Sequence, residues 1–364
     1  MRILVIGTDA TIFQKNSDAR HRTEEYARLF DEYHMIIYSR PGFQQEAVPP
    51  LFIYPTNSLF YFFRPFDAFR IGRQIIHRSG IGLVSVQDPA ESGIAGWLLK
   101  KTYGIKLHIQ IHADFFSPFF RKNSWKELVR YWLARFIIPR GDKFRVVSRR
   151  VADSLNSEFG IRHSAVSLLP IFVDRERIAG IRPSFGLRQK YPEFDFIIIM
   201  VSRLVREKNI SLALLAFRDF LKEFPKSGLI IVGDGPGRER LKLENSVRLE
   251  GWQNDLVSYY KGADLYFLTS NFEGYSRSVV EAAAAGCPVV MTDVGVAGEV
   301  IQDGKTGRVV KVGDKNALVR ALCEARRHYD DSRRMAEGAK ELVLAAPPRT
   351  WQDYLKLYKD SFGF

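Results

Sequence analysis

A length of 364 residues, 46% of them hydrophobic, is enough for two cores of ordinary size and favours two domains. Two cysteines, Cys287 and Cys323, are too few for a disulfide framework or a cysteine zinc site, and the seven histidines lack metal-site spacing, so neither a metal ion nor another cofactor is expected. There is no apolar run of about 18 residues and no cleavable signal pattern before the first predicted strand, so we expect a soluble, cytoplasmic chain.

The formal net charge of +13 is concentrated in the first half of the chain. Residues 1–170 hold 24 Lys or Arg against 15 Asp or Glu. A field of this sign attracts nucleic acid, anionic lipid or phosphorylated substrates, and it also fits a merely solvated basic surface. Charge alone does not separate these possibilities.

Short apolar, β-branched runs alternate with amphipathic helical patterns such as residues 92–103 and 123–138. Runs of this kind are typical of parallel strands buried on both faces, with helices crossing between them. The first set is RILVIG, HMIIYS, GLVSVQ, KLHIQI, FRVVS and VSLLP, and the second is FIIIMV, GLIIVGDG, VRLEG, DLYFLT, PVVMT and GRVVK. The repeated alternation predicts an α/β protein with two doubly wound, Rossmann-like domains.

The expected boundaries follow from composition. Residues 172–195 are polar, contain Pro and Gly and have no periodicity, so we interpret them as a linker between domains 1–171 and 196–347. Residues 348–364 begin with Pro348 and continue with apolar residues at helical spacing, which predicts a terminal helix that packs back across the junction. Ligands of doubly wound sheets bind beyond the carboxyl ends of the strands, so two facing domains would form one cleft.

The first strand-end motif of the second domain is SRLVREKN, which follows FIIIMV. It places Arg203 and Lys208 five residues apart, just before a helix expected to start near Asn209. A guanidinium and an ammonium group converging at a helix N-terminus would bind a diphosphate, although a solvated basic loop has the same residues.

The next motif is VGDGPGRERLK, with Gly233 and Gly235 directly after a strand. Glycines let the backbone approach a phosphate or a ribose closely, and Pro236 suits the first turn of a helix. A plain strand-to-helix turn is the alternative. The third glycine is misplaced for a G-x-G-x-x-G fingerprint, which disfavours a nicotinamide cofactor.

The third motif is FEGYSRSVVEAAAAGCPVV, which follows DLYFLT. Glu273 lies in the turn, the amides of Gly274, Tyr275 and Ser276 precede a helix, and Glu281 lies about a turn and a half inside it. Carboxylates accept hydrogen bonds from sugar hydroxyls. A glycoside hydrolase also uses two carboxylates, but the neighbouring basic loop favours a phosphate leaving group.

These motifs, together with DGKTGRVV, resemble family 4 of the retaining glycosyltransferases (glycosyl transferases group 1), which have the GT-B fold of two Rossmann-like domains facing across a cleft. The resemblance covers the carboxyl-terminal domain. It implies that Arg203 and Lys208 neutralise the donor diphosphate, that Glu281 holds the nucleotide ribose, and that Glu273 contacts the donor sugar beside the amides of residues 274–276. Gly233 and Gly235 belong to the same donor site.

The resemblance also implies that His112, after the strand KLHIQI, lies near the anomeric carbon and completes a catalytic set with Glu273, Arg203 and Lys208. Asp114 is a weaker companion of the acceptor side and fits a local turn former. Family members usually carry a Gly-Gly turn after the first strand, whereas here Gly7 is the sole glycine. The customary Asn-Gly pair after LLP is also absent, so acceptor binding is where this chain departs from the pattern.

The function we expect is retaining transfer of a sugar from a GDP- or UDP-linked donor to a glycan or a polyprenyl-lipid acceptor. The motifs include no D-x-D element, and fixed cations can stabilise the departing diphosphate, so transfer without a metal ion is expected. Aromatic and basic side chains in the first half would suit an anionic membrane surface, on the cytoplasmic face, although they would equally suit a core with solvated arginines. The residues concerned are Phe60, Tyr61, Phe62, Phe63, Arg64, Phe66, Arg70, Arg73, Trp125, Tyr131 and Trp132.

Three alternatives stay open at this point. A nucleotide-sugar epimerase of the same fold would need no second substrate. A sugar-nucleotide-binding pseudoenzyme would fit the missing Gly-Gly turn. A nucleic-acid binder would fit the charge, but no recognised RNA or DNA module occurs in the sequence, so nucleic acid is not an expected partner.

Overall fold

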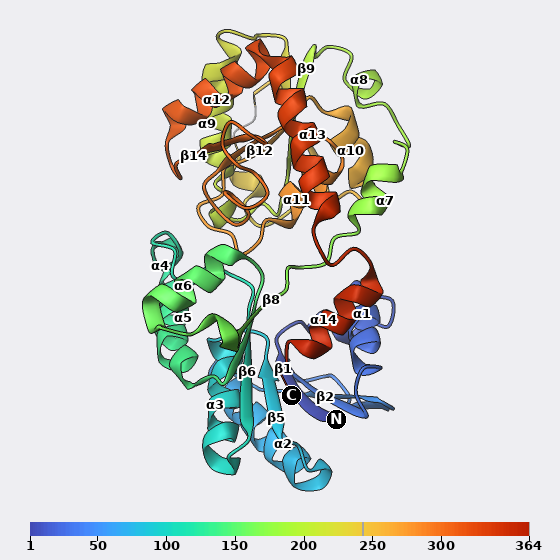
Figure 1. Cartoon of the computed structure of the whole chain (residues 1–364), viewed down its shortest axis with the longest axis vertical. Helices are drawn as coiled ribbons and strands as arrows, with labels where there is room; N and C mark the ends of the chain where they lie inside the picture. The colour runs from blue at the N-terminus through green and yellow to red at the C-terminus, as the bar shows by residue number, and fades with distance from the viewer. Residues whose placement is uncertain (242–243, 364) are drawn as a thin grey trace. The chain divides into compact units, whose positions relative to one another are not determined.

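The computed structural model describes residues 1–241 and 244–363, which divide into two compact units (Figure 1). The first unit contains Met1–Pro170 together with the residues from Gln352 onward, and the second contains Ile171–Trp351. Each unit is a predominantly parallel sheet with helices packed on it, so the predicted pair of doubly wound α/β domains is confirmed. No helix within the described residues is long and apolar enough to cross a lipid bilayer.

The sheet of the first unit has eight strands in the order β3-β4-β2-β1-β5-β6-β7-β8, with only β3 antiparallel to its neighbour. All six strands predicted in this half are present. The prediction missed the edge pair β3 and β4, which are short and stand beside prolines. The bounds are β1 Arg2–Gly7, β2 Glu32–Ile37, β3 Glu46–Val48, β4 Leu51–Pro55, β5 Leu83–Val86, β6 Lys106–Ile111, β7 Lys143–Val146 and β8 Val166–Leu168.

The helices of the first unit begin at serine caps and end at glycines where the local sequence allows it. Ser124 accepts a hydrogen bond from the backbone of Glu127 at the start of α5, and Gly104 ends α3 with φ of 67°. The predicted helices at 92–103 and 123–138 are confirmed as α3 and α5. The bounds are α1 Asp18–Ala27, η2 Tyr61–Phe63, α2 Arg64–Ser79, α3 Glu91–Tyr103, α4 Phe120–Asn123, α5 Trp125–Ile137 and α6 Arg149–Phe159.

The carboxyl-terminal helix α14 (Trp351–Asp360) packs within the first unit, although the chain before it belongs to the second. The ring of Tyr358 stacks on Tyr26 with centroids 4.1 Å apart, and the hydroxyl of Tyr354 accepts a hydrogen bond of 2.6 Å from the guanidinium of Arg145. Phe362, just beyond α14, packs edge-on against Tyr358. The chain therefore returns to its first unit at its end.

A buried polar chain lies beneath this helix. Gln110 Nε2 donates to Ser85 Oγ at 3.1 Å, and Ser85 Oγ is hydrogen-bonded to His108 Nδ1, 2.9 Å away. His108 is fully buried against Phe362, and its Nε2 has no partner among the described residues. Burial, followed by the positive charge of Arg145, lowers the pKa of His108 to about 3.

This buried imidazole is expected to make the fold acid-sensitive. The folded pKa lies below the unfolded value of about 6.5, so the unfolded chain binds more protons between these two values, and stability falls as the pH drops through that window. We expect His108 to lower the free energy of unfolding by about 2 kcal/mol between about pH 7 and about pH 5, as measured by urea unfolding. The His108→Gln variant should lose correspondingly less, and the exposed His163→Gln variant should behave like the parent. An equal pH dependence in all three proteins would contradict this role.

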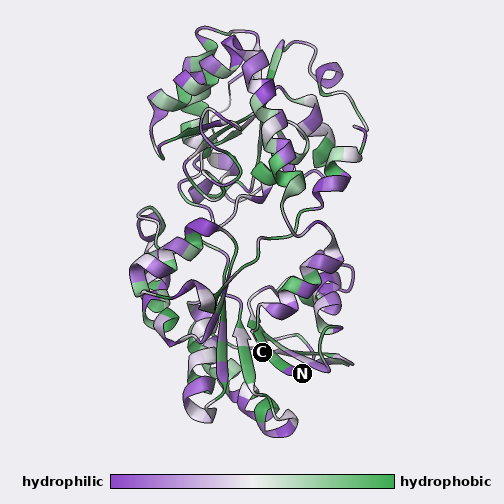
Figure 2. Ribbon diagram, viewed as in Figure 1, coloured by the Kyte–Doolittle hydropathy of each residue, from purple (hydrophilic) through white to green (hydrophobic). Residues whose placement is uncertain are grey.

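The second unit has a six-stranded, fully parallel sheet in the order β11-β10-β9-β12-β13-β14. Its strands match the six predicted runs, and Figure 2 shows their apolar colouring. The strand bounds are β9 Phe196–Val201, β10 Ser227–Val232, β11 Val247–Gly251, β12 Leu265–Leu268, β13 Val289–Thr292 and β14 Arg308–Val310. The helix bounds are α7 Arg175–Gly180, α8 Leu187–Lys190, α9 Ile210–Leu221, α10 Leu256–Gly262, α11 Arg277–Ala284, α12 Lys315–Arg327 and α13 Tyr329–Ala345.

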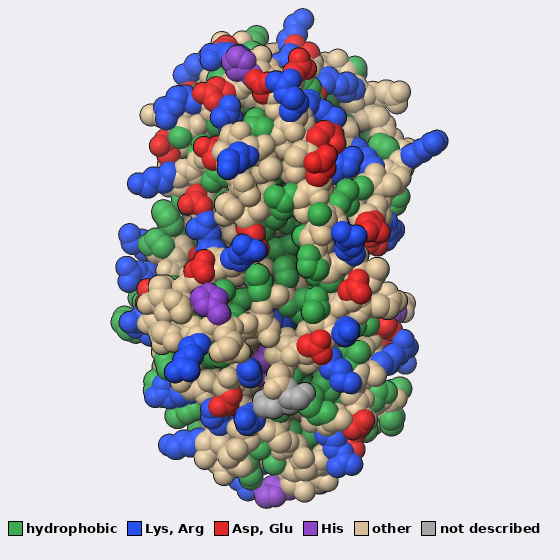
Figure 3. All heavy atoms as spheres, in the orientation of Figure 1, with side chains coloured by type: hydrophobic (Ala, Val, Ile, Leu, Met, Phe, Trp, Pro, Cys, Tyr) green, Lys and Arg blue, Asp and Glu red, His purple; other side chains and the backbone are tan. Residues whose placement is uncertain are grey.

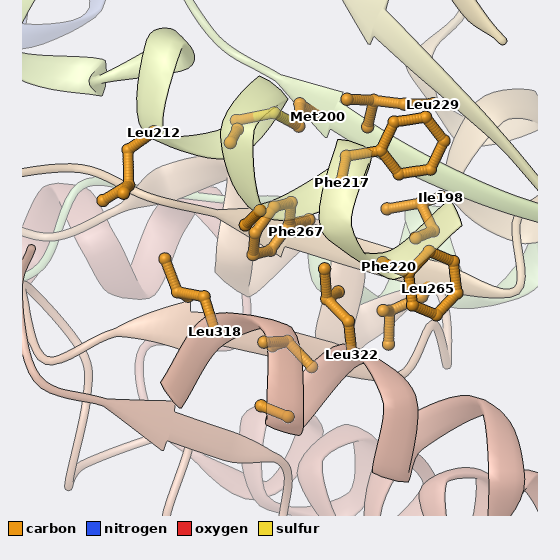
Figure 4. Close-up of a cluster of buried hydrophobic side chains, with 14 of the residues drawn as sticks. Ile198, Met200, Leu212, Phe217, Phe220, Leu229, Leu265, Phe267, Leu318 and Leu322 are labelled. Carbon is orange, nitrogen blue, oxygen red and sulfur yellow. The ribbon is translucent and has the colours of Figure 1, made fainter. Parts of the chain in front are cut away.

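The core of this unit lies between the sheet and the helices α9 and α12 (Figure 4). Phe217 and Phe220 from α9 and Leu318 and Leu322 from α12 are almost fully buried in one cluster with the strand residues. Fully burying such side chains contributes about 1.5–3 kcal/mol each, before the entropy cost of ordering them. This packing fixes the strand ends on which the functional loops stand.

Residues 172–195, which we expected to form a linker, contain α7 and α8 and group with the second unit. Arg175, at the start of α7, is buried and donates hydrogen bonds to the carbonyl oxygens of Ala346 (2.9 Å) and Pro348 beyond α13. The segment lacks periodicity because its two helices are a turn or two long, so a pattern search finds nothing although the segment is packed.

Candidate functional site

Three loops of the second unit meet at the carboxyl edge of its sheet. They follow β9, β10 and β12, which are neighbours in the sheet. Because the strands are parallel, the ends of all three open at the same edge. The predicted donor-site residues lie in these loops or in the first turns of the helix that follows β12: Arg203, Lys208, Gly233, Gly235, Glu273, Gly274, Tyr275, Ser276 and Glu281.

The loop after β9 carries the two predicted cations in different settings. The side chain of Arg203 is 72% exposed and lies 3.5 Å from the carboxylate of Glu207. Lys208, at the end of a short 3-10 turn, is only 14% exposed and forms an ion pair with Glu273. Helix α9 begins at Ile210, as predicted. One cation is therefore held in place, and the other can move to meet a ligand.

Hydrogen bonds join the loop after β9 to the loop after β12. Thr269 Oγ1 lies 3.1 Å from the carbonyl oxygens of both Lys208 and Asn209. The amide of Asn271 donates to the carbonyl of Glu207 at 2.7 Å, and the side-chain amides of Asn209 and Asn271 are 2.9 Å apart. Asn209 takes a left-handed backbone with φ of 49°, which asparagine tolerates better than most residues. These bonds fix the positions of Lys208 and Glu273.

Glu273 turns its carboxylate toward protein donors. It accepts a hydrogen bond of 2.7 Å from Ser270 Oγ as well as the ion pair from Lys208, and it is 13% exposed. An ammonium group has three donors and a carboxylate has about four acceptor positions. The pair therefore keeps capacity for both a phosphate oxygen and a sugar hydroxyl without separating.

The turn before α11 presents backbone amides. Ser276 has φ of 68°, and the helix starts at the next residue, so the amides of Arg277 and Ser278 lie in the first turn, where a helix supplies no acceptor of its own, while the amide of Val279 donates to the carbonyl of Ser276 at 3.0 Å. Ser276 Oγ is buried without a hydrogen-bond partner among the described residues. Burial raises the pKa of Tyr275 to about 12, so its side chain stays neutral and serves as packing.

Glu281 is the fifth residue of α11 and is buried. Tyr260 donates its hydroxyl to one carboxylate oxygen at 3.0 Å, and Arg277 Nε donates to the other at 2.7 Å. Burial and the Glu281 charge raise the pKa of Tyr260 well above its usual range, so it stays a donor. Each oxygen keeps a lone pair that could accept from a ligand hydroxyl.

The glycines after β10 allow the loop after β10 to pack closely against the loop after β9. Gly233 has φ of 132°, and a Cβ there would lie 2.0 Å from the carbonyl oxygen of Ser202. Gly235 makes a similar approach to the same loop. The packing between the two loops therefore explains both glycines by itself, and our interpretation that they let the backbone approach a ligand stays a prediction. The helix expected from Pro236 is, within the described residues, only the 3-10 turn η6 (Arg238–Arg240).

A small pocket of about 150 Å³ opens beside these glycines. Trp252 stands directly after β11 at its rim and is 75% exposed. Sequence reasoning missed this residue, although a large aromatic side chain after a strand end repeats the position of the other motifs. The lining residues are Val201, Ser202, Arg203, Val232, Gly233, Asp234, Trp252, Gln253 and Leu256.

The first unit carries the other three predicted site residues at the carboxyl ends of β1 and β6. Gly7 ends β1, where a Cβ would collide with the side-chain amide of Gln87. His112 follows β6 and is exposed; surrounding protein atoms and the charges of Arg145 and Arg22 lower its pKa, so it is neutral near pH 7.

Asp114 forms a local turn, as one of our two interpretations had it. Its carboxylate accepts a hydrogen bond of 3.1 Å from the amide of Ser117, and burial raises its pKa. In residues 1–241 and 244–363, no group of three or more His, Cys, Asp or Glu side chains is arranged to hold a metal ion.

Known proteins resemble both units. Residues 19–177 match the family described as Glycosyltransferase Family 4, and residues 187–342 match Glycosyl transferases group 1. The chain is 25% identical over 337 residues to N-acetyl-alpha-D-glucosaminyl L-malate synthase of Bacillus anthracis, which covers 88% of this chain and 86% of that protein.

Two further likenesses are informative. The chain is 26% identical over 235 residues, 62% of each protein, to the N-acetylgalactosamine-N,N'-diacetylbacillosaminyl-diphospho-undecaprenol 4-alpha-N-acetylgalactosaminyltransferase of Campylobacter jejuni. The solved structure of Anabaena HepE in complex with UDP-glucose has a TM-score of 0.73 and 19% identity, covering 100% of this chain and 98% of that one. This last likeness shows a common fold.

The close approach at Gly233 gives a test of the loop architecture. Replacing Gly233 by Ala should destabilise the second unit by about 2 kcal/mol or more, because the new Cβ meets a backbone oxygen and the left-handed φ disfavours any side chain. Thermal unfolding should show this loss. Gly180→Ala, where nothing lies within 4 Å of the added Cβ, is the matched control and should change little. Equal melting temperatures for the two variants would refute the packing role.

Proposed function

The chain belongs to the GT-B glycosyltransferases of family 4 and group 1, and from this premise we propose how it transfers a sugar. The donor is a nucleoside-diphosphate sugar, and the acceptor is a hydroxyl of a glycan or of a lipid-linked glycan at the cytoplasmic face of the membrane. Transfer proceeds with retention of configuration and without a metal ion.

The observation that carries the donor assignment is the fixed position of Lys208. Its side chain is only 14% exposed, its ammonium group is held by Glu273, and it belongs to a loop hydrogen-bonded to the neighbouring loop. A cation fixed in advance stabilises developing negative charge without first reorganising, and one such donor is worth about 3–4 kcal/mol of barrier. Exposed Arg203 can close on the same diphosphate with two parallel hydrogen bonds.

The reaction requires the bond between the anomeric carbon and the diphosphate oxygen to break. A new bond forms between that carbon and the acceptor oxygen, and the acceptor proton passes to the departing phosphate oxygen. We propose that the negative charge of this leaving group is stabilised by Lys208, Arg203 and the first amides of α11. In this proposal Glu273 orients the sugar by accepting hydrogen bonds from its hydroxyls.

The rest of the donor is assigned to the neighbouring groups. In this proposal the base stacks on Trp252 at the pocket of about 150 Å³, and Glu281 accepts a hydrogen bond from the ribose. The complex of HepE with UDP-glucose supports a uridine donor, although a guanosine donor would use the same stacking surface. The lipid-linked substrate in the name of the Campylobacter jejuni relative supports a lipid-linked acceptor.

Replacing Lys208 or Arg203 by Ala should lower turnover by about a hundredfold or more, because each substitution removes a cation that stabilises the leaving diphosphate. The measurement is acceptor-dependent release of the nucleotide in the presence of EDTA, which also distinguishes transfer from epimerisation. Arg206→Ala is the matched control, since Arg206 is an exposed cation in the same 3-10 turn.

Two outcomes would contradict the donor assignment. Turnover that stays within a few-fold in the Lys208 and Arg203 variants would remove the cations from the mechanism. Activity abolished by EDTA and restored by magnesium would replace them with a metal ion. Because Lys208→Ala leaves the carboxylate of Glu273 without its cation, the melting temperature of each variant is compared first.

Replacing Trp252 by Ala should weaken donor binding by about tenfold while leaving turnover at saturating donor nearly unchanged, because stacking acts on the base and not on the reacting carbon. The parameters to compare are KM for the donor and kcat. Trp252→Phe should restore most of the affinity. A loss confined to kcat would assign the tryptophan another role.

A further inference from the structure

The first unit exposes large apolar side chains in two segments, the residues around η2 and the outer side of α5. Leu59 is 81% exposed, Phe62 77% and Trp125 75%, values far above those of core side chains. We call these residues the aromatic-basic face. Its apolar members are Leu59, Phe60, Tyr61, Phe62, Phe63, Phe66, Trp125, Leu128, Val129, Trp132 and Phe136.

Contacts join the two segments into one surface. The ammonium of Lys126, on α5, lies 5.6 Å from the ring centre of Tyr61, in η2. Tyr61 donates its hydroxyl to one oxygen of Glu91 at 2.7 Å, and Arg130 Nε, also on α5, donates to the other at 3.1 Å. The start of α3 therefore holds η2 and α5 side by side.

The face is strongly basic. Residues 59–73 and 119–136 together hold eight Lys or Arg and two Asp or Glu. Asp67 accepts a hydrogen bond of 2.6 Å from Ser58 and lies 3.8 Å from the guanidinium of Arg70. Glu127 is bonded to the cap residue Ser124 and lies 4.0 Å from the guanidinium of Arg130. Figure 3 shows that basic side chains are numerous on the surface of the chain, with hydrophobic side chains among them. With eight cations against two acids, most of the positive charge of the face is not neutralised within it.

One expected member does not belong to the face. Tyr131 is buried and packs edge-on against Phe116 in the interior, so only its neighbour Trp132 points outward. The sequence could not separate these two residues, which lie one position apart on an amphipathic helix. The exposed fractions decide the alternative that the sequence left open, namely that these aromatics fill a core: most of them do not.

We propose that the aromatic-basic face docks the first unit on the surface of a bilayer that contains anionic lipid. Aromatic rings lie at the boundary between headgroups and acyl chains, while basic residues are attracted to the anionic headgroups. A protein interface would deplete lysine at its centre, whereas here Lys126 stands among the aromatics. The inference deepens the proposed function by naming the membrane that would carry the acceptor, and it rests on that function only in this respect.

Vesicle flotation tests the proposal, with phosphatidylcholine alone or mixed with phosphatidylglycerol, and without any donor sugar. The protein should float with the anionic vesicles and be released by high salt. The Phe62→Ser/Trp125→Ser variant should bind at least about tenfold more weakly, because two exposed rings are lost. Leu215→Ser/Ile181→Ser, which removes two exposed apolar side chains of the second unit, is the matched control and should float like the parent.

The outcomes are distinct from those of the transfer assay. Absence of flotation by the parent protein, or equal flotation of the Phe62/Trp125 variant, overturns the membrane assignment while leaving donor chemistry untouched. A dimer seen by sedimentation, lost in the same variant and accompanied by no flotation, would assign the face to a second copy of the chain. Release of the nucleotide from the donor in the presence of a water-soluble acceptor should be unchanged in this variant, so failure of the transferase proposal appears separately.

Discussion

The ion pair between Lys208 and Glu273 holds together the part of the molecule on which the donor assignment depends. The two residues come from loops that follow adjacent parallel strands, and hydrogen bonds between the same loops, from the backbone of Asn271 and the side chains of Thr269 and Asn209, keep them in place. A site for a diphosphate needs positive charge that is already in place, yet a buried cation without a partner would be costly. The carboxylate of Glu273 offsets the cost of desolvating Lys208, and the hydrogen-bond donors and acceptors that the pair does not use remain for a ligand.

The two units solve different physical problems. The second keeps a polar edge rigid through glycine-dependent loop contacts and a core of interlocked aromatic and aliphatic side chains. The first buries a polar chain around His108 and Arg145 beneath its terminal helix, while leaving apolar rings on its surface. Apolar exposure of this extent is unfavourable in water, so it indicates a surface with a partner.

Much of the fold is legible in the sequence, because strands buried on both faces leave continuous apolar runs and the loops that follow them carry the polar motifs. The predicted donor residues accordingly lie in three neighbouring loops and in the first turns of α11. The features that could not be predicted from the sequence depend on contacts between residues that are distant in the chain. The pair of edge strands around Leu51–Pro55, the packed segment 172–195, the inward turn of Tyr131 and the rim position of Trp252 each require knowledge of a neighbour that is distant in the chain.

The most direct measurement of the central claim is calorimetric titration of the protein, in EDTA, with UDP and GDP and with the corresponding nucleosides. If fixed cations hold the diphosphate, one of the two diphosphates should bind at least about tenfold more tightly than its nucleoside, and the difference should shrink as salt is raised. Equal affinities for nucleoside and diphosphate, or a diphosphate preference that appears only when magnesium is added, would contradict the account.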